Sequence, residues 1–188
     1  MIARQFVYAL IAGFVCISAI QAETTKEEKV NDFVLHVPDA WKKEQPSNAM
    51  RALQFSVPAV AGDPRPGEFA VFNFKGGGTV SQNIERWISQ FDREGRKALL
   101  FEGKSASGRY WIADISGTYN KSVGPPFLRK TESQPGSRVL AVLLVGKQGN
   151  VLYLKLDGPE KTIAAQTARI RQMIGADPES EKPFSLEQ

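Results

Sequence analysis

The sequence contains almost no cysteine or histidine. Its 188 residues include one cysteine, Cys16, and one histidine, His36. A single cysteine cannot form a disulfide within the chain, so the fold depends on its apolar core. A single histidine excludes zinc sites and catalytic centres that require two imidazole groups. We therefore expect no disulfide, no metal site and no cofactor.

The short motifs that carry nucleophilic catalysis are also missing. The chain has no G-x-S-x-G, S-x-x-K or C-x-x-C, the patterns that place a reactive serine or cysteine. Residues 98–105 fit the loose form of a phosphate-binding loop, but residues 99–101 are strand-like and no helix follows. Carboxylates such as Asp92 and Glu102 occur singly, so nothing points to a catalytic pair, although the sequence does not exclude one.

The chain has no strong excess of charge of one sign. It carries 24 Lys and Arg against 20 Asp and Glu, which are interspersed, and its formal net charge is +4. This excess is too small and too scattered to indicate nucleic-acid binding. The length is sufficient for one domain with a sizeable core. We expect a monomer.

One long apolar run stands at the N-terminus. Arg4 precedes apolar residues 6–17, and a short segment that ends at Ala22 follows. This is the layout of a secretory signal peptide, and the run is shorter than the roughly 20 residues of a membrane-spanning helix. We predict that residues 1–22 are a signal peptide cleaved after Ala22 and that the protein is secreted or periplasmic. An uncleaved anchor is the alternative.

Seven stretches of the remaining chain have the alternation or the apolar content of β-strands. They are residues 30–37, 51–57, 68–74, 97–103, 109–119, 138–145 and 151–157. Residues 23–29 are polar and are expected to form a leader into the fold. Residues 139–145 are apolar throughout, so this strand should be covered on both faces.

Two amphipathic helices are available to cover the sheet. The first is expected over residues 80–92, with Thr79 as N-cap and with Ile84, Trp87, Ile88 and Phe91 on one stripe. The second follows Gly158, with Pro159 in its first turn, and has Gly175 as its C-cap. Its apolar face is formed by Ile163, Thr167, Ile170 and Ile174.

Short turns between consecutive strands favour an antiparallel sheet. The sequence therefore predicts an α+β fold in which an antiparallel β-sheet is sandwiched between helices in α/β/α layers. A single domain is expected over residues 23–175. Residues 176–188 are acidic and contain proline, and they are expected to form a mobile tail.

The aromatic residues and the histidine are assigned mainly to structure. Trp87 belongs to the helical stripe and Trp111 to an apolar strand, so both are expected in the core. Trp41 follows a turn, and either a surface role or packing on the sheet is compatible with its position. His36 alternates with apolar neighbours and is expected to be exposed or hydrogen-bonded.

The first candidate ligand site is a glycine loop before the first helix. It consists of Gly76, Gly77 and Gly78, flanked by Lys75 and Arg86. Free amides at a helix N-terminus favour anions, so the loop is a candidate ligand contact. The alternative is a tight strand-to-helix connection that requires glycine.

The second candidate site is the connection over residues 121–137, which is too long for a simple hairpin loop. It contains Phe127 and Leu128 beside Arg129 and Lys130. An apolar anchor next to positive charge suits docking on an acidic partner. A mobile surface loop without a role is the alternative.

Three segments carry a resemblance to a known fold. These are Phe-Val-Leu-His-Val-Pro-Asp-Ala-Trp at residues 33–41, Asn-Ile-Glu-Arg-Trp at residues 83–87, and Leu-Lys-Leu-Asp-Gly-Pro at residues 154–159. With this order of elements the chain resembles uncharacterised secreted bacterial proteins of the Mog1/PsbP-like fold. The resemblance implies an antiparallel sheet between helices and a function in binding other proteins. The resemblance assigns no functional residue to this chain.

The sequence thus favours an exported, non-enzymatic binding or accessory domain of the cell envelope that docks on a protein partner. The alternative is an envelope hydrolase, or a lipid- or carbohydrate-active enzyme, that uses isolated carboxylates. An enzyme would need titratable groups that converge in one cleft.

Overall fold

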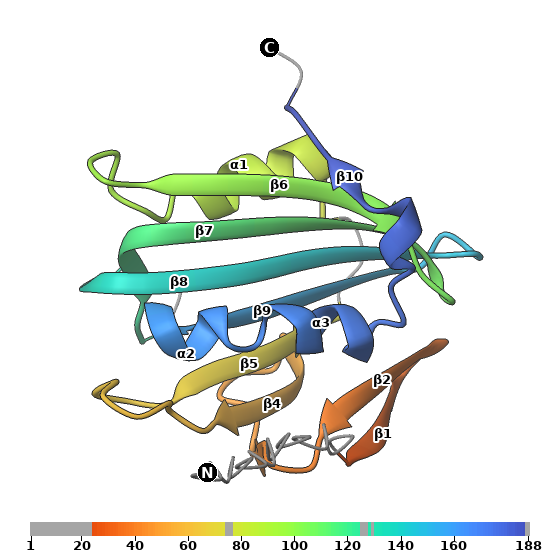
Figure 1. Ribbon diagram of the computed structural model, residues 1–188, viewed down its shortest axis with the longest axis horizontal. Helices are drawn as coiled ribbons and strands as arrows, with labels where there is room; N and C mark the ends of the chain where they lie inside the picture. Colours follow the sequence, from red (N-terminus) through yellow and green to blue (C-terminus); the bar gives the residue numbers. More distant parts are fainter. Residues whose placement is uncertain (1–23, 74–76, 125–127, 129, 187–188) are drawn as a thin grey trace, which may run out of the picture.

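The computed structural model describes residues 24–73, 77–124, 128 and 130–186. Its centre is an eight-stranded sheet (Figure 1). The strands are β3 (Lys42–Glu44), β4 (Arg51–Val57), β5 (Gly67–Phe72), β6 (Lys97–Lys104), β7 (Gly108–Ser122), β8 (Thr131–Gly146), β9 (Val151–Pro159) and β10 (Lys182–Pro183). They lie in the order β10-β6-β7-β8-β9-β5-β4-β3, and every neighbouring pair is antiparallel.

Helices cover both faces of this sheet. The helices α2 (Glu160–Ala164) and α3 (Thr167–Met173) lie in front of it in Figure 1, and α1 (Val80–Ile88) lies behind it. The predicted α+β fold with α/β/α layers is therefore confirmed. Alternate residues of β8 enter the two cores: Leu140 and Val142 face α2 and α3, whereas Ala141 and Leu143 face α1. This explains why the strand is apolar throughout.

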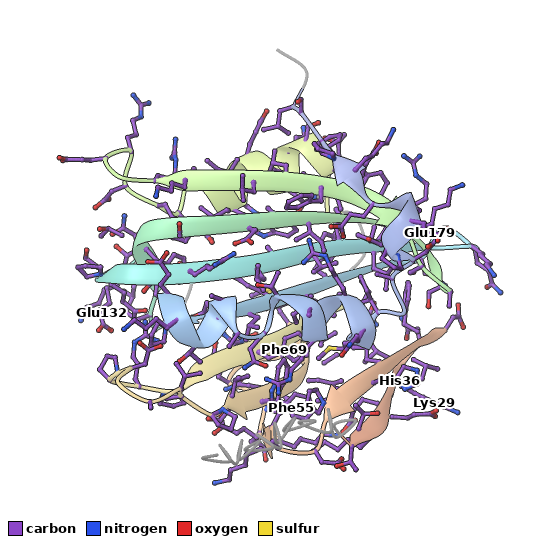
Figure 2. All side chains as sticks on the ribbon, viewed as in Figure 1. Lys29, His36, Phe55, Phe69, Glu132 and Glu179 are labelled. Carbon is purple, nitrogen blue, oxygen red and sulfur yellow. The ribbon has the colours of Figure 1, made fainter. Side chains whose placement is uncertain are left out.

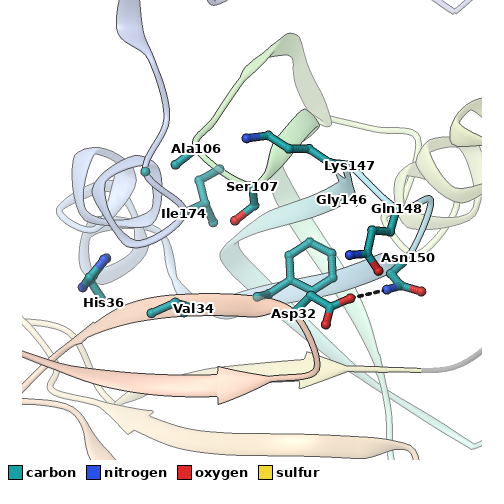
Figure 3. Close-up of a pocket in the computed structure, with 12 residues that line it drawn as sticks. Asp32, Val34, His36, Ala106, Ser107, Gly146, Lys147, Gln148, Asn150 and Ile174 are labelled. Carbon is teal, nitrogen blue, oxygen red and sulfur yellow. Dashed lines mark hydrogen bonds between the residues drawn. The ribbon is translucent and has the colours of Figure 1, made fainter.

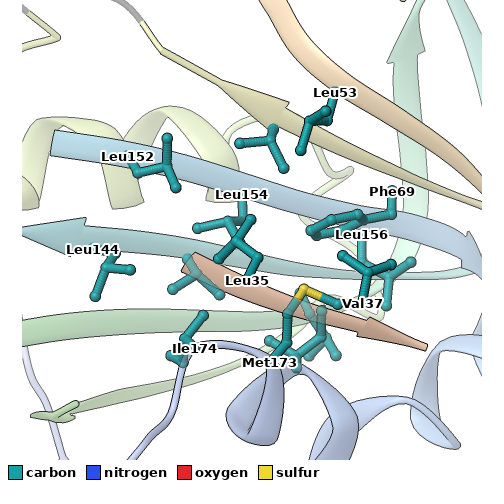
Figure 4. Packing of buried hydrophobic residues seen from close by; sticks show 14 of the residues in the cluster. Leu35, Val37, Leu53, Phe69, Leu144, Leu152, Leu154, Leu156, Met173 and Ile174 are labelled. Carbon is teal, nitrogen blue, oxygen red and sulfur yellow. The ribbon is translucent and has the colours of Figure 1, made fainter. Parts of the chain in front are cut away.

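The core beneath α2 and α3 is closed by a separate hairpin. Its strands are β1 (Thr25–Val30) and β2 (Phe33–Pro38). Figure 4 shows Leu35 and Val37 of β2 close to Leu154, Leu156 and Met173. This layer and the helices exclude water from the same face of the sheet.

Trp41 packs into this core. Its side chain is 2% exposed, and its ring centroid lies 5.2 Å from that of Phe69. Figure 2 shows Phe55 and Phe69 in the interior and Lys29 at the periphery. Of the two positions compatible with the sequence, packing on the sheet is correct.

On the opposite face, α1 anchors the second core. Ile84, Trp87 and Phe91 are buried against β7 and β8, and Trp111 is buried in the same cluster. Thr79 caps the helix as predicted. Its Oγ1 accepts a hydrogen bond from the backbone N–H of Gln82, and Gln82 Oε1 accepts one from the backbone N–H of Thr79.

Several predicted boundaries are wrong. The first helix ends at Ile88 instead of residue 92, because the Asp92 amide donates to the Thr118 carbonyl and the chain turns towards β7. The second helix is split into α2 and α3, although Ile163 and Ile170 still face the core. The predicted leader over residues 23–29 contains strand β1, which pairs with β2 along its whole length. Its side chains are mostly polar, so no hydrophobic pattern indicates a strand there.

The connection over residues 121–137 is also shorter than predicted. Strands β7 and β8 extend into it and remain paired as far as Ser122 and Thr131. Pro135 and Gly136 lie at a bulge opposite Thr118, where the register shifts. Proline and glycine therefore mark a bulge within a long hairpin and not a loop.

The segment after residue 175 differs from the predicted mobile tail. Strand β10 pairs with β6, and the Phe184 amide donates to the Leu100 carbonyl at 2.9 Å. Glu181 accepts hydrogen bonds from Arg171 and from the Tyr110 hydroxyl. The segment is thus held by residues that are distant in the sequence, and its composition alone does not indicate such contacts.

Candidate functional site

A recess of about 930 Å³ opens on the α1 face of the sheet. It exists because α1 is only nine residues long and covers part of that face. We call it the α1-face recess. It is lined by Ser47, Asn48, Met50, Arg51, Glu68, Ala70, Phe72, Arg86, Trp87, Gln90, Tyr119, Lys121, Ser122, Val123, Gly124, Lys130, Thr131, Tyr153, Leu154, Lys155 and Asp157.

Four charged side chains form an ion-pair network in this recess. Glu68 of β5 and Asp157 of β9 are direct neighbours in the strand register. Lys121 Nζ lies 2.7 Å from Asp157 Oδ2 and 3.4 Å from Glu68 Oε1. Arg51 Nη1 lies 2.9 Å from Glu68 Oε1. Each carboxylate is thus neutralised by at least one cation of the protein itself.

The ion-pair network keeps Glu68 ionised. Burial alone would raise the pKa of this carboxyl group, because the charged form loses its hydration. Attraction by Lys121 and Arg51 outweighs burial and lowers the pKa below its usual value. Glu68 is therefore an anion at neutral pH.

Lys155 lies beside this network on β9. Its Nζ donates to Gln90 Oε1 at 2.8 Å and to Tyr119 Oη at 2.6 Å. Among the described residues, no carboxylate lies within ion-pair distance of this ammonium group. Lys155 is thus held by neutral acceptors only.

Burial lowers the pKa of Lys155 to about 8. The two carboxylates of the ion-pair network oppose this effect, and its two cations add to it. Burial also raises the pKa of Tyr119, as do the nearby carboxylates. The tyrosine therefore stays neutral and accepts the lysine hydrogen bond.

Aromatic rings fix the geometry around these polar groups. Tyr119 packs against Phe91 with ring centroids 5.1 Å apart. The Arg51 guanidinium lies 5.6 Å from the Phe72 ring centroid, and its buried Nε has no hydrogen-bond partner among the described residues. Aromatic rings therefore lie directly beside the charged groups of the floor.

Two of the predicted contact residues stand at the rim. Arg86 of α1 and Lys130, just before β8, are both exposed and line the recess. Arg86 Nη2 donates to Asn83 Oδ1 at 2.6 Å, which directs it along the helix. The two predicted sites, which the sequence left separate, thus contribute one cation each to the same recess.

The rest of the glycine loop is only partly described. Lys75 and Gly76 lie outside the described residues. The Gly77 carbonyl accepts from Asn83 Nδ2 at 2.6 Å, and Gly78 has a φ of 81°. Glycine at residue 78 therefore meets a conformational requirement of the turn.

The predicted docking motif is also partly described. Phe127 and Arg129 lie outside the described residues. Leu128 is 59% exposed. Its role as a partner contact stays a prediction.

The floor of the recess is not marked as a site in the sequence. Lys155 and Asp157 alternate with apolar residues in β9, which was compatible with a solvent face. Asp157 is in fact 4% exposed, because β9 lies inside the sheet with β8 and β5 on either side. The feature of the sequence that could have indicated this site is the pair of charged residues at alternate positions of a strand that is otherwise apolar.

A second cavity of about 380 Å³ lies at the turns beside β2. Figure 3 shows His36 on the side towards α3 and Asp32 beside Asn150, whose Nδ2 donates to Asp32 Oδ2 at 2.6 Å. His36 is exposed, as expected. His36 and Asp32 do not converge, so this cavity is the weaker candidate.

Over residues 24–73, 77–124, 128 and 130–186, no group of three His, Cys, Asp or Glu side chains is arranged to hold a metal ion. No helix in this part of the chain has the length and apolar character to cross a membrane.

Comparisons with known proteins give distant structural similarity. No protein-family model and no curated protein matches the chain. It is similar to cyanobacterial PsbP (CyanoP) from Synechocystis sp. PCC 6803, with a TM-score of 0.46, 12% identity, and coverage of 91% of this chain and 99% of that one. It is also similar to LpqN, involved in cell envelope biogenesis of Mycobacterium tuberculosis, with a TM-score of 0.41, 15% identity, and coverage of 80% and 82%. These similarities assign no residue and no activity to this chain.

Proposed function

We propose that the protein is an exported, non-enzymatic binding domain that docks an acidic protein partner of the cell envelope at the α1-face recess. One observation carries the proposal: cationic side chains outnumber carboxylates around an open recess. The cations are Arg51, Arg86, Lys121, Lys130 and Lys155, and the carboxylates are Glu68 and Asp157. Complementary charge steers a partner and fixes its orientation.

The export of the domain rests on the sequence of residues 1–22, which lie outside the described residues. The basic, apolar and small-residue regions of this segment support a cleaved signal peptide. Mass spectrometry of the protein recovered from the envelope would test it. A mature N-terminus at Glu23 is expected, and an intact Met1 would contradict cleavage.

An enzyme remains the alternative because two carboxylates do converge in the recess. Hydrolysis by a carboxylate pair requires one protonated acid with a raised pKa. Glu68 has a lowered pKa, and Lys121 lies within ion-pair distance of both Glu68 and Asp157. The pair is therefore better suited to orienting Lys121 than to transferring protons.

Charge reversal at the rim tests the docking site. Arg86→Glu with Lys130→Glu should abolish capture of the envelope partner that the wild-type protein retains, because both side chains are exposed at the rim. The matched control is Arg93→Glu with Lys97→Glu, which changes the net charge equally outside the recess. Equal loss of capture in both variants, or in neither, would contradict docking at the recess.

A further inference from the structure

The recess floor contains a cation without a counter-charge. Every other buried charge of the floor belongs to the ion-pair network of Arg51, Glu68, Lys121 and Asp157. Lys155 contacts only the neutral groups of Gln90 and Tyr119. A partly desolvated ammonium group in this state is costly unless something else compensates it.

We infer that Lys155 is the anchor for a carboxylate, which an acidic segment of the partner protein inserts into the α1-face recess. This inference rests on the proposed docking at that recess. An ammonium group has three donors, and two of those of Lys155 are used within the protein. The third is available to an incoming oxygen.

The charged and polar groups around Lys155 come from several elements. Asp157 lies on its own strand, Glu68 on β5, Arg51 on β4, and Lys121 and Tyr119 on β7. The α1 side supplies Gln90, which follows the helix, and Arg86 at the rim. The two carboxylates are already paired with Arg51 and Lys121. They cannot turn to Lys155 without breaking those pairs.

The dimensions favour a peptide segment over a free small anion. A volume of about 930 Å³ is at the upper end for ligand sites, and a single carboxylate would fill little of it. Arg86 and Lys130 extend the positive charge to the rim, and Met50 is 51% exposed there. An acidic segment with an apolar residue matches this mixture of charge and apolar surface.

Calorimetry with a defined probe tests the inference. The probe is an acetylated and amidated peptide, Asp-Glu-Phe-Glu-Asp, and its control is Asn-Gln-Phe-Gln-Asn. We expect the acidic peptide to bind the wild-type protein and the amide peptide not to bind. Lys155→Met should weaken binding at least tenfold, whereas Lys97→Met, an exposed lysine outside the recess, should change it less than twofold.

A second measurement needs no variant. In the wild-type protein with ¹³C-labelled lysine, the titration midpoint of Lys155 should move upward when the acidic peptide is added, because a carboxylate stabilises the ammonium form. An unchanged midpoint, or equal binding by Lys155→Met, would overturn the inference. If rim reversal at Arg86 and Lys130 still weakened binding in that case, docking at the recess would stand and only the role of Lys155 would fall.

Discussion

The binding role proposed for Lys155 comes at the expense of stability. Its pKa of about 8 in the folded protein is below the usual value of 10.5. Between these two values the unfolded chain retains a proton that the folded chain has lost. Stability must therefore rise with pH in this range, since the unfolded state binds more protons. The charge of Lys155 thus opposes folding at neutral pH.

The first prediction concerns this pH dependence. From pH 7 to pH 10, the free energy of unfolding of the wild-type protein should rise relative to that of Lys155→Met. The expected gain is about 1–2 kcal/mol, because one pKa unit corresponds to about 1.4 kcal/mol and Lys155 is only partly buried. Urea unfolding at both pH values measures it. A difference between the two proteins that is independent of pH would contradict the lowered pKa.

The second prediction concerns Trp87, which is 6% exposed in the core beneath α1. Trp87→Ala should lower the free energy of unfolding by about 3–5 kcal/mol, since it removes a large buried side chain. Leu99→Ala is the control, because Leu99 is 58% exposed on β6. Chemical denaturation compares the two. A nearly neutral effect of Trp87→Ala would mean that α1 does not depend on this contact.

At the scale of elements, the C-terminal segment over residues 177–186, which we call the C-terminal strap, pairs with β6 at the edge of the sheet. Burial alone would raise the pKa of Glu181, but hydrogen bonds from Arg171 and Tyr110 lower it. A lowered carboxyl pKa stabilises the fold above the usual value of 4.5, and this contribution is lost as the pH falls through the lower value. The C-terminal strap therefore depends on an ionised Glu181.

The third prediction follows from this element. Removal of residues 177–188 should lower the free energy of unfolding at pH 7 by about 2–4 kcal/mol, because it removes β10 and exposes Tyr110. Glu181→Gln should lose about 1–2 kcal/mol of this at pH 7 and less below pH 4. Urea titrations at pH 7 and pH 3.5 separate the two effects. A truncated protein as stable as the full chain would restore the sequence-based view of a mobile tail.

The elements differ in how well the sequence predicted them. Strands β4, β6 and β9 were placed within a few residues, because alternation or continuous apolar content marks them. Strand β1 and the outer half of the β7–β8 hairpin were missed, because both are rich in polar residues. These segments are strands because their backbones pair with a neighbour, and backbone pairing leaves no hydrophobic pattern in the sequence.

At the scale of the whole molecule, the layered fold was predictable and the recess was not. The layers follow from one strand that is apolar on both faces and from helices with single apolar stripes. The recess depends on how much of one face α1 leaves uncovered and on which strands become neighbours. Arg51 and Lys155 are 104 positions apart in the sequence, and only the strand order brings them to the same recess.

The sequence did supply part of the candidate site. The charge of Arg86 beside a glycine loop and of Lys130 beside an apolar pair predicts ligand or partner contacts, and both residues line the recess. Their proximity could not be predicted, because it requires α1 and the β7–β8 hairpin to meet on one face. Lys155 on the floor has a different cause: its alternation with apolar residues in β9 is equally compatible with a solvent-exposed face.

The most direct test of the account is a chemical-shift map of the protein during titration with the acidic peptide Asp-Glu-Phe-Glu-Asp. We predict that the largest changes will cluster at Gln90, Tyr119 and Lys155 on the floor and at Arg86 and Lys130 on the rim, which together line the α1-face recess. Changes centred on the smaller cavity or on α2 and α3, with none at the recess, would contradict the account.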